Sequence, residues 1–121
     1  MNQHINKILV PIDFSEQSIV ALEQSYNLAR EYHAEITLLY IIEDNGLFAK
    51  LVSGEQNYDL QIDELKKNIQ ERLDALAAAA EQKSKLDIKT IIVKGAIYEK
   101  IAEVAEVINA TMIIMGTNGG E

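Results

Sequence analysis

Two short segments of this sequence carry residue types that suit the binding of a phosphate or a sugar. Residues 116–121 read Gly-Thr-Asn-Gly-Gly-Glu and follow an apolar run at Thr111–Met115. In a glycine-rich turn the backbone N–H groups can approach a phosphate closely, because no Cβ stands in the way. Asp13 and Ser15 follow another apolar run and supply a carboxylate and a hydroxyl. The two segments predict a binding site if the fold brings them together.

The elements that must position these segments follow from the hydrophobic pattern. Short apolar runs rich in β-branched residues predict four strands, at Lys7–Ile12, Glu35–Ile42, Ile88–Val93 and Thr111–Met115. Apolar residues three and four positions apart predict three helices. The first ends near Tyr32, the second runs from Asp59 to Lys83, and the third runs from Tyr98 to Ile108. Glu43–Tyr58 contains several helix breakers and is predicted to be a loop.

The alternation of strands and helices indicates the fold class. It implies an α/β fold, an open parallel sheet with right-handed crossovers and helices on both faces. We expect a Rossmann-like strand order 3-2-1-4, in which the first and fourth strands are neighbours where the order reverses. A ligand-binding crevice opens there, outside the carboxyl ends of the strands. Asp13 and Gly116 are therefore expected on two sides of one crevice.

Composition restricts the partners of the chain. Its 121 residues suit a single domain, and 11 Lys and Arg against 19 Asp and Glu give a formal net charge of -8. This balance argues against nucleic acids and anionic membranes, which attract clustered positive charge. The sequence shows no signal peptide, no transmembrane run and no cysteine. We therefore expect a cytoplasmic location.

Several other kinds of site are disfavoured. A Walker A loop fails after Gly95, because Lys100 stands where a second glycine is needed, and no Gly-x-Gly-x-x-Gly follows the first strand. A phosphoacceptor receiver domain needs an Asp at the end of its third strand, where this chain has Val93 and Lys94. Ser15 has no His nearby in the sequence. We expect no catalytic group, and at most slow ATP hydrolysis by the complete protein.

Some of these residues also have simpler interpretations. Asp13 and Ser15 are typical helix N-cap residues, and capping is compatible with ligand binding. The glycines of residues 116–120 also suit a flexible linker. Three apolar positions are interpreted as core residues, namely Ile97, Tyr98 and Met115.

Taken together, the chain resembles the universal stress protein family. The matching features are Pro11, Asp13 and Ser15 after the first strand, the strand at 38–41, the Gly95 turn, and the segment 115–119. Element order and lengths agree from Lys7 to Gly119. The resemblance implies the fold of the adenine nucleotide alpha hydrolase-like proteins. It also implies a stress-response or signalling module whose complete protein binds ATP or a related adenine nucleotide, with or without magnesium.

The resemblance further implies roles for individual residues. Asp13 would lie beside the ribose or the base, and main-chain groups of Ile41 would pair with the adenine edge. The ribose and phosphate end would be lined by Met115, Gly116 and Gly119. The complete set of expected nucleotide-binding residues is Pro11, Ile12, Asp13, Ser15, Ile41, Met115, Gly116, Thr117, Asn118 and Gly119.

The family pattern also has parts that would fall beyond Glu121: a last glycine with Ser or Thr, a helix and a fifth strand. We therefore interpret residues 1–121 as a single, C-terminally incomplete domain and expect weak or no nucleotide binding by this chain alone. The complete protein is expected to form a homodimer or to pair with a tandem domain. The alternative is an interaction module that binds no nucleotide and acts through dimerisation or partner docking. A nucleotide-dependent ligase on the same scaffold ranks third.

Overall fold

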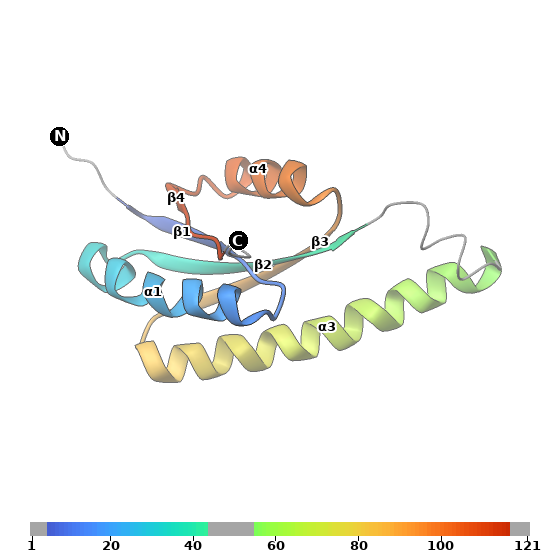
Figure 1. Cartoon of the computed structure of the whole chain (residues 1–121), viewed down its shortest axis with the longest axis horizontal. Helices are drawn as coiled ribbons and strands as arrows, with labels where there is room; N and C mark the ends of the chain where they lie inside the picture. Colours follow the sequence, from blue (N-terminus) through green and yellow to red (C-terminus); the bar gives the residue numbers. More distant parts are fainter. Residues whose placement is uncertain (1–4, 44–54, 117–121) are drawn as a thin grey trace.

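The computed structural model describes residues 5–43 and 55–116, which form one parallel sheet flanked by helices (Figure 1). The strands are β1 (Lys7–Pro11), β2 (Glu35–Glu43), β3 (Ile88–Gly95) and β4 (Met112–Ile113). They lie in the order β3-β2-β1-β4, and every neighbouring pair is parallel. The expected fold class and strand order are confirmed. Because β1 and β4 are neighbours, their carboxyl ends meet at one edge of the sheet.

Three helices pack on the two faces of this sheet. They are α1 (Glu16–Tyr32), α3 (Glu55–Ser84) and α4 (Ile97–Val107). In Figure 1, α1 and α3 lie on one side of the sheet and α4 lies on the other. Within the described residues, no helix is both long enough and apolar enough to cross a lipid bilayer.

The alternation of side chains along each strand divides the core into two clusters. Residues at every second position of a strand face the same side of a sheet. Ile8 and Val10 of β1 therefore pack with α1 and α3, whereas Leu9 packs with α4. The larger cluster also includes Leu22, Ala29, Ile36, Leu38, Leu73 and Ala77, and the smaller one includes Leu39, Ile101 and Val104.

Two predicted elements differ from the observed ones. The second helix was predicted from Asp59, but α3 begins at Glu55, inside the predicted loop. The loop prediction treated Asn57 as a breaker, yet Asn costs only a few tenths of a kcal/mol, roughly, inside a helix. The fourth strand was predicted over five residues, whereas β4 has two. The backbone N–H groups of Thr111 and Ile114 still donate to the carbonyls of Lys7 and Leu9, over 2.9 and 3.0 Å, so contact with β1 continues on both sides of the short strand. The hydroxyl of Thr111 also accepts hydrogen bonds from the backbone of Asn6 and Lys7.

Candidate functional site at the carboxyl edge of the sheet

A pocket of about 560 Å³ opens at the carboxyl edge of the sheet, between the two helical layers. It is bordered by the ends of β1 and β2, the first turns of α1 and α4, and the chain after β4. Ligand pockets commonly have volumes of about 300–1,000 Å³. Seven of the ten expected nucleotide-binding residues line this pocket: Pro11, Ile12, Asp13, Ser15, Ile41, Met115 and Gly116.

The pocket therefore joins the segment of Asp13 and Ser15 with the glycine-rich segment that begins at Gly116. Asp13 follows β1 and Gly116 follows β4, and both border the same hollow. Thr117, Asn118 and Gly119 lie outside the described residues. The geometry thus unites the described members of the set, while their role in binding a nucleotide stays a prediction.

Asp13 is placed by a tight turn between β1 and α1. Its Oδ1 accepts a hydrogen bond of 2.9 Å from the backbone N–H of Ser15, while its side chain remains exposed. Hydrogen bonding from Ser15, chiefly from its hydroxyl and less from its backbone N–H, holds the pKa of the Asp13 carboxyl below its usual value of 3.8, and burial opposes this effect. The carboxylate is therefore charged at neutral pH. It faces the pocket as a hydrogen-bond acceptor.

Ser15, and not Asp13, caps the helix that follows. The Ser15 hydroxyl accepts a hydrogen bond of 3.1 Å from the backbone N–H of Ser18, as an N-cap side chain does. The buried Ser18 hydroxyl donates in return to the Ser15 carbonyl over 2.9 Å. Of the two residues proposed for capping, Ser15 has that role. Asp13 is left to hold the turn and to face the pocket.

Gly116 is required by the close approach of two chain segments. A Cβ at this position would overlap the backbone of Gln17 and Ser18 in the first turn of α1. Any side chain here would therefore push the segment after β4 away from α1. The glycine lets the two segments meet and close one side of the pocket.

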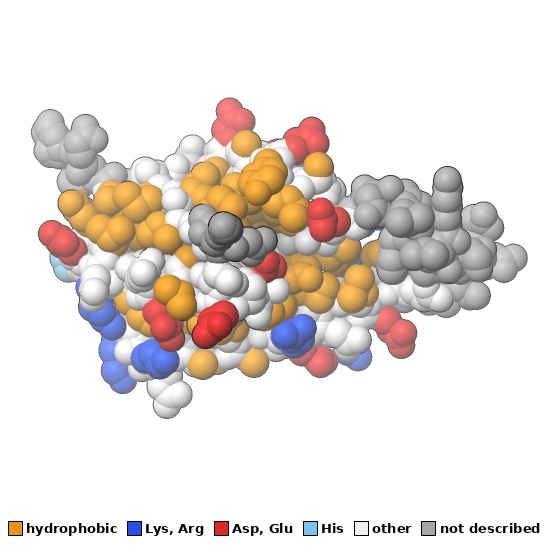
Figure 2. Space-filling view, in the orientation of Figure 1, with side chains coloured by type: hydrophobic (Ala, Val, Ile, Leu, Met, Phe, Trp, Pro, Cys, Tyr) orange, Lys and Arg blue, Asp and Glu red, His pale blue; other side chains and the backbone are white. Residues whose placement is uncertain are grey.

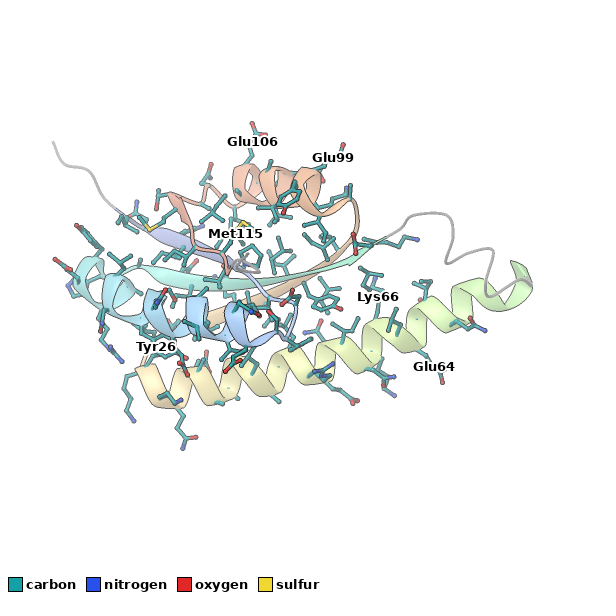
Figure 3. All side chains as sticks on the ribbon, in the orientation of Figure 1. Tyr26, Glu64, Lys66, Glu99, Glu106 and Met115 are labelled. Atoms are coloured by element: carbon teal, nitrogen blue, oxygen red, sulfur yellow. The ribbon has the colours of Figure 1, made fainter. Side chains whose placement is uncertain are left out.

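The walls of the pocket include residues that the sequence argument did not assign to a site. They are Gln17, Ser18, Leu39, Ile97, Tyr98 and Ile101. The interpretation of Ile97 and Tyr98 as core residues is wrong, because they are 36% and 76% exposed. Met115, also interpreted as core, is 40% exposed. Figure 3 shows it between α1 and α4. The Gly95 turn was the available signal, since α4 begins just after it at the same sheet edge.

The pocket carries little charge. Among its described lining residues there is one carboxylate, Asp13, and there is no Lys, Arg or His. Figure 2 shows Lys and Arg mainly on the side of α1 and α3, whereas acidic and hydrophobic side chains occur on both sides. In the part of the chain that the structure describes, no three His, Asp or Glu side chains gather to hold a metal ion. An uncharged sugar or base therefore suits these walls better than a bare phosphate.

Comparisons with known proteins agree with this architecture. The profile of the Universal stress protein family matches residues 4–121. Universal stress protein MJ0531 of Methanocaldococcus jannaschii is 31% identical over 113 residues, which cover 93% of this chain and 65% of that protein. The present chain therefore spans less than two thirds of the length of this relative.

Solved structures give the same result. Protein MJ0577 of the same organism has a TM-score of 0.71 and 28% identity, over 98% of this chain and 78% of that one. A universal stress protein solved in complex with cAMP has a TM-score of 0.61 at 16% identity, over 92% of this chain and 71% of that one, and this likeness shows the shared fold. The profile covers nearly the whole sequence, and a relative above 30% identity covers 93% of it. This chain therefore belongs to the universal stress protein family.

Proposed function

We propose that this chain is a stress-response or signalling domain that binds the nucleoside part of an adenine nucleotide in the pocket at the carboxyl edge of its sheet. The observation that carries the proposal is the meeting of seven expected site residues, from three separate segments, around one hollow of suitable volume. The cAMP complex of a protein with the same fold supports an adenine nucleotide as the ligand class. We propose binding and not turnover, because the carboxylate of Asp13 and the hydroxyl of Ser15, which line the described part of the pocket, are held by the turn and by the cap of α1.

The chemistry of the pocket suggests how such a ligand would lie. The Asp13 carboxylate is an acceptor suited to the hydroxyls of a ribose. Leu39, Ile41 and Ile101 give an apolar wall against which a flat base can pack. The main-chain groups of Ile41 would then pair with the edge of the adenine. Phosphates would extend toward Gly116 and the residues that follow it.

The proposal is tested by nuclear magnetic resonance titration of the chain with adenosine, AMP and ATP at up to millimolar concentrations. We expect shifts of the backbone amides at residues 12–18, 39–41 and 115–116, with weak affinity. Guanosine is the matched ligand control, because a pocket that reads the adenine edge should bind it less tightly. The proposal is wrong if no adenine ligand moves these amides.

A variant pair tests the role of the carboxylate. Asp13→Ala removes the acceptor that faces the ligand, so we expect adenosine affinity to fall about tenfold, a factor typical of one hydrogen bond to a charged group. Asp63→Ala removes an exposed carboxylate on α3, outside the pocket, and should leave affinity unchanged. Equal affinities for the two variants would exclude Asp13 from the site.

The alternative function, an interaction module, has its own supporting observation. Val20, Ile113 and Met115 are 43%, 41% and 40% exposed, and β4 lies at the edge of the sheet. Exposed apolar side chains on an edge strand favour pairing with another chain. Light scattering over a range of concentrations should then show association that Ile113→Lys weakens. Val107→Lys, at a 75% exposed position on α4, is the matched control.

A further inference from the structure

Phe14, between Asp13 and Ser15, has an unusual backbone conformation. Its φ is 64°, in the left-handed region. This conformation costs roughly 1–2 kcal/mol for a residue with a Cβ. Such a residue keeps its conformation only where its surroundings over-determine it. The contacts of the Phe14 side chain therefore decide how firmly the turn that carries Asp13 is held.

Two side chains from other elements fix the ring of Phe14. Tyr40 of β2 lies beside it, with ring centroids 5.4 Å apart and planes tilted by 32°. Arg72 of α3 places its guanidinium carbon 4.0 Å from the centroid of the Phe14 ring. This is well within the distance of about 6 Å at which a cation is attracted to an aromatic face. The ring of Phe14 thus connects the turn to β2 and α3.

α3 contributes no described residue to the lining of the pocket, so Arg72 can influence an uncharged ligand only indirectly, and Phe14 is the contact that connects them. If the ring moves, Phe14 can leave the left-handed region. The hydrogen bond between Ser15 N–H and Asp13 Oδ1 depends on that turn and would change with it. A contact on the outer helix therefore reaches the carboxylate in the pocket.

We propose that Arg72 is a positioning residue for this pocket: by stacking on Phe14 it holds the turn at residues 13–15, and with it the Asp13 carboxylate, in the orientation that faces the ligand. The ligand half of this inference rests on the proposed function, whereas the effect of Arg72 on the turn does not.

The molecule offers a matched control for this contact. Arg30 lies over the ring of Tyr26 at 5.9 Å, on α1 and away from the residue 13–15 turn. Arg30→Met removes an arginine–aromatic contact of the same kind, but one that borders neither Asp13 nor Phe14. Arg72→Met keeps an unbranched apolar side chain in place of the guanidinium. Arg72 is exposed, so this variant is expected to fold.

The first measurement needs no ligand. Backbone chemical shifts of Phe14 and Ser15 report the conformation of the turn. We expect Arg72→Met to move them away from their wild-type values, Arg72→Lys to restore them in part, and Arg30→Met to leave them unchanged. If the shifts in Arg72→Met equal those of the wild type, the positioning role is wrong.

The second measurement is the affinity for adenosine, which is chosen because it carries no charge that would respond to the lost arginine. We expect Arg72→Met to weaken it about two- to fivefold, the factor that corresponds to a partly exposed cation–π contact, with partial recovery in Arg72→Lys. If the wild type binds adenosine, and Arg72→Met lowers thermal stability but leaves the affinity for adenosine unchanged, the proposal is wrong. If the wild type binds no adenosine and the Phe14 shifts still move in Arg72→Met, the proposed function fails but the effect of Arg72 on the turn stands.

Discussion

Two kinds of turn in this molecule use the same left-handed backbone conformation for different reasons. His33, Lys85 and Asn109 adopt it at the ends of α1, α3 and α4, where their backbone N–H groups return to helix carbonyls. Phe14 adopts it between a strand and a helix, beside the pocket. Helices often end in this way, because the returning N–H satisfies a free carbonyl.

The difference shows where the backbone strain is compensated. At the helix ends it is compensated locally, by a hydrogen bond to the preceding turn. At Phe14 the support comes from Tyr40 and Arg72, which are distant in the sequence. The pocket therefore depends on the tertiary structure for the position of Asp13, the one carboxylate among its described lining residues, whereas the helix ends do not.

The largest expected effect on stability comes from removing the ring of Phe14, which is the group that Tyr40 and Arg72 contact. Phe14→Ala deletes the ring that Tyr40 and Arg72 contact and leaves a strained residue behind. Because Phe14 is only half-buried, we expect the free energy of unfolding to fall by about 2 kcal/mol, less than for a fully buried Phe. Urea denaturation measures this value. His33→Ala, at an exposed helix end, should cost much less stability. Equal costs would mean that the contacts of Phe14 with Tyr40 and Arg72 add nothing to the stability of its turn.

Ser15→Ala tests the local part of the same turn. It removes the side-chain cap of α1, so we expect a loss of about 1 kcal/mol in the free energy of unfolding. The same variant should raise the pKa of Asp13 toward its usual value, because bonding to Ser15 is the main cause of the lowering. Carbon-13 titration of the Asp13 carboxyl checks this. An unchanged carboxyl pKa would contradict the assignment.

Glycine at the two kinds of turn should act in opposite directions. His33→Gly relieves the left-handed strain and loses only an exposed side chain. Glycine also gives the unfolded chain more freedom, which offsets part of this gain. We therefore expect the free energy of unfolding to rise by about 0.5 kcal/mol. Phe14→Gly relieves the same strain but loses the ring, and so it should destabilise. Thermal melts of the two variants compare them. Stabilisation by both would show that the Phe14 ring contributes nothing.

The smallest expected effect is the pH dependence that comes from Asp13. Its pKa is lower in the folded chain than the usual 3.8, so the folded state favours the charged carboxylate. The resulting stability is present above about pH 4 and is lost as the pH falls through the folded-state pKa. Asp13→Asn should therefore make the decline in stability below about pH 4 shallower. Because Asp13 is exposed, the change will be small. A steeper decline would mean that the pKa of Asp13 is not lowered in the folded chain.

Much of the fold and part of the site could be predicted from the sequence. The apolar runs and helical stripes located every described strand and helix, although β4 is shorter and α3 longer than expected. Strand order placed Asp13 and Gly116 at one edge, and both line the pocket there. Ile97 and Tyr98 were misassigned as core because the apolar stripe of α4 does not show where the helix leaves the sheet. The contacts of Phe14 could not be predicted, since its partners lie on two distant elements.

The sequence alone determined the class of the domain and the edge of the sheet at which the pocket opens. Periodic burial and the order of strands are local properties that can be read along the chain. The tertiary structure alone decided which side chains face the hollow, why residue 116 must be glycine, and that Arg72 supports a strained turn. Those features depend on distances between segments far apart in the chain, and these distances exist only once the sheet and its helices have packed.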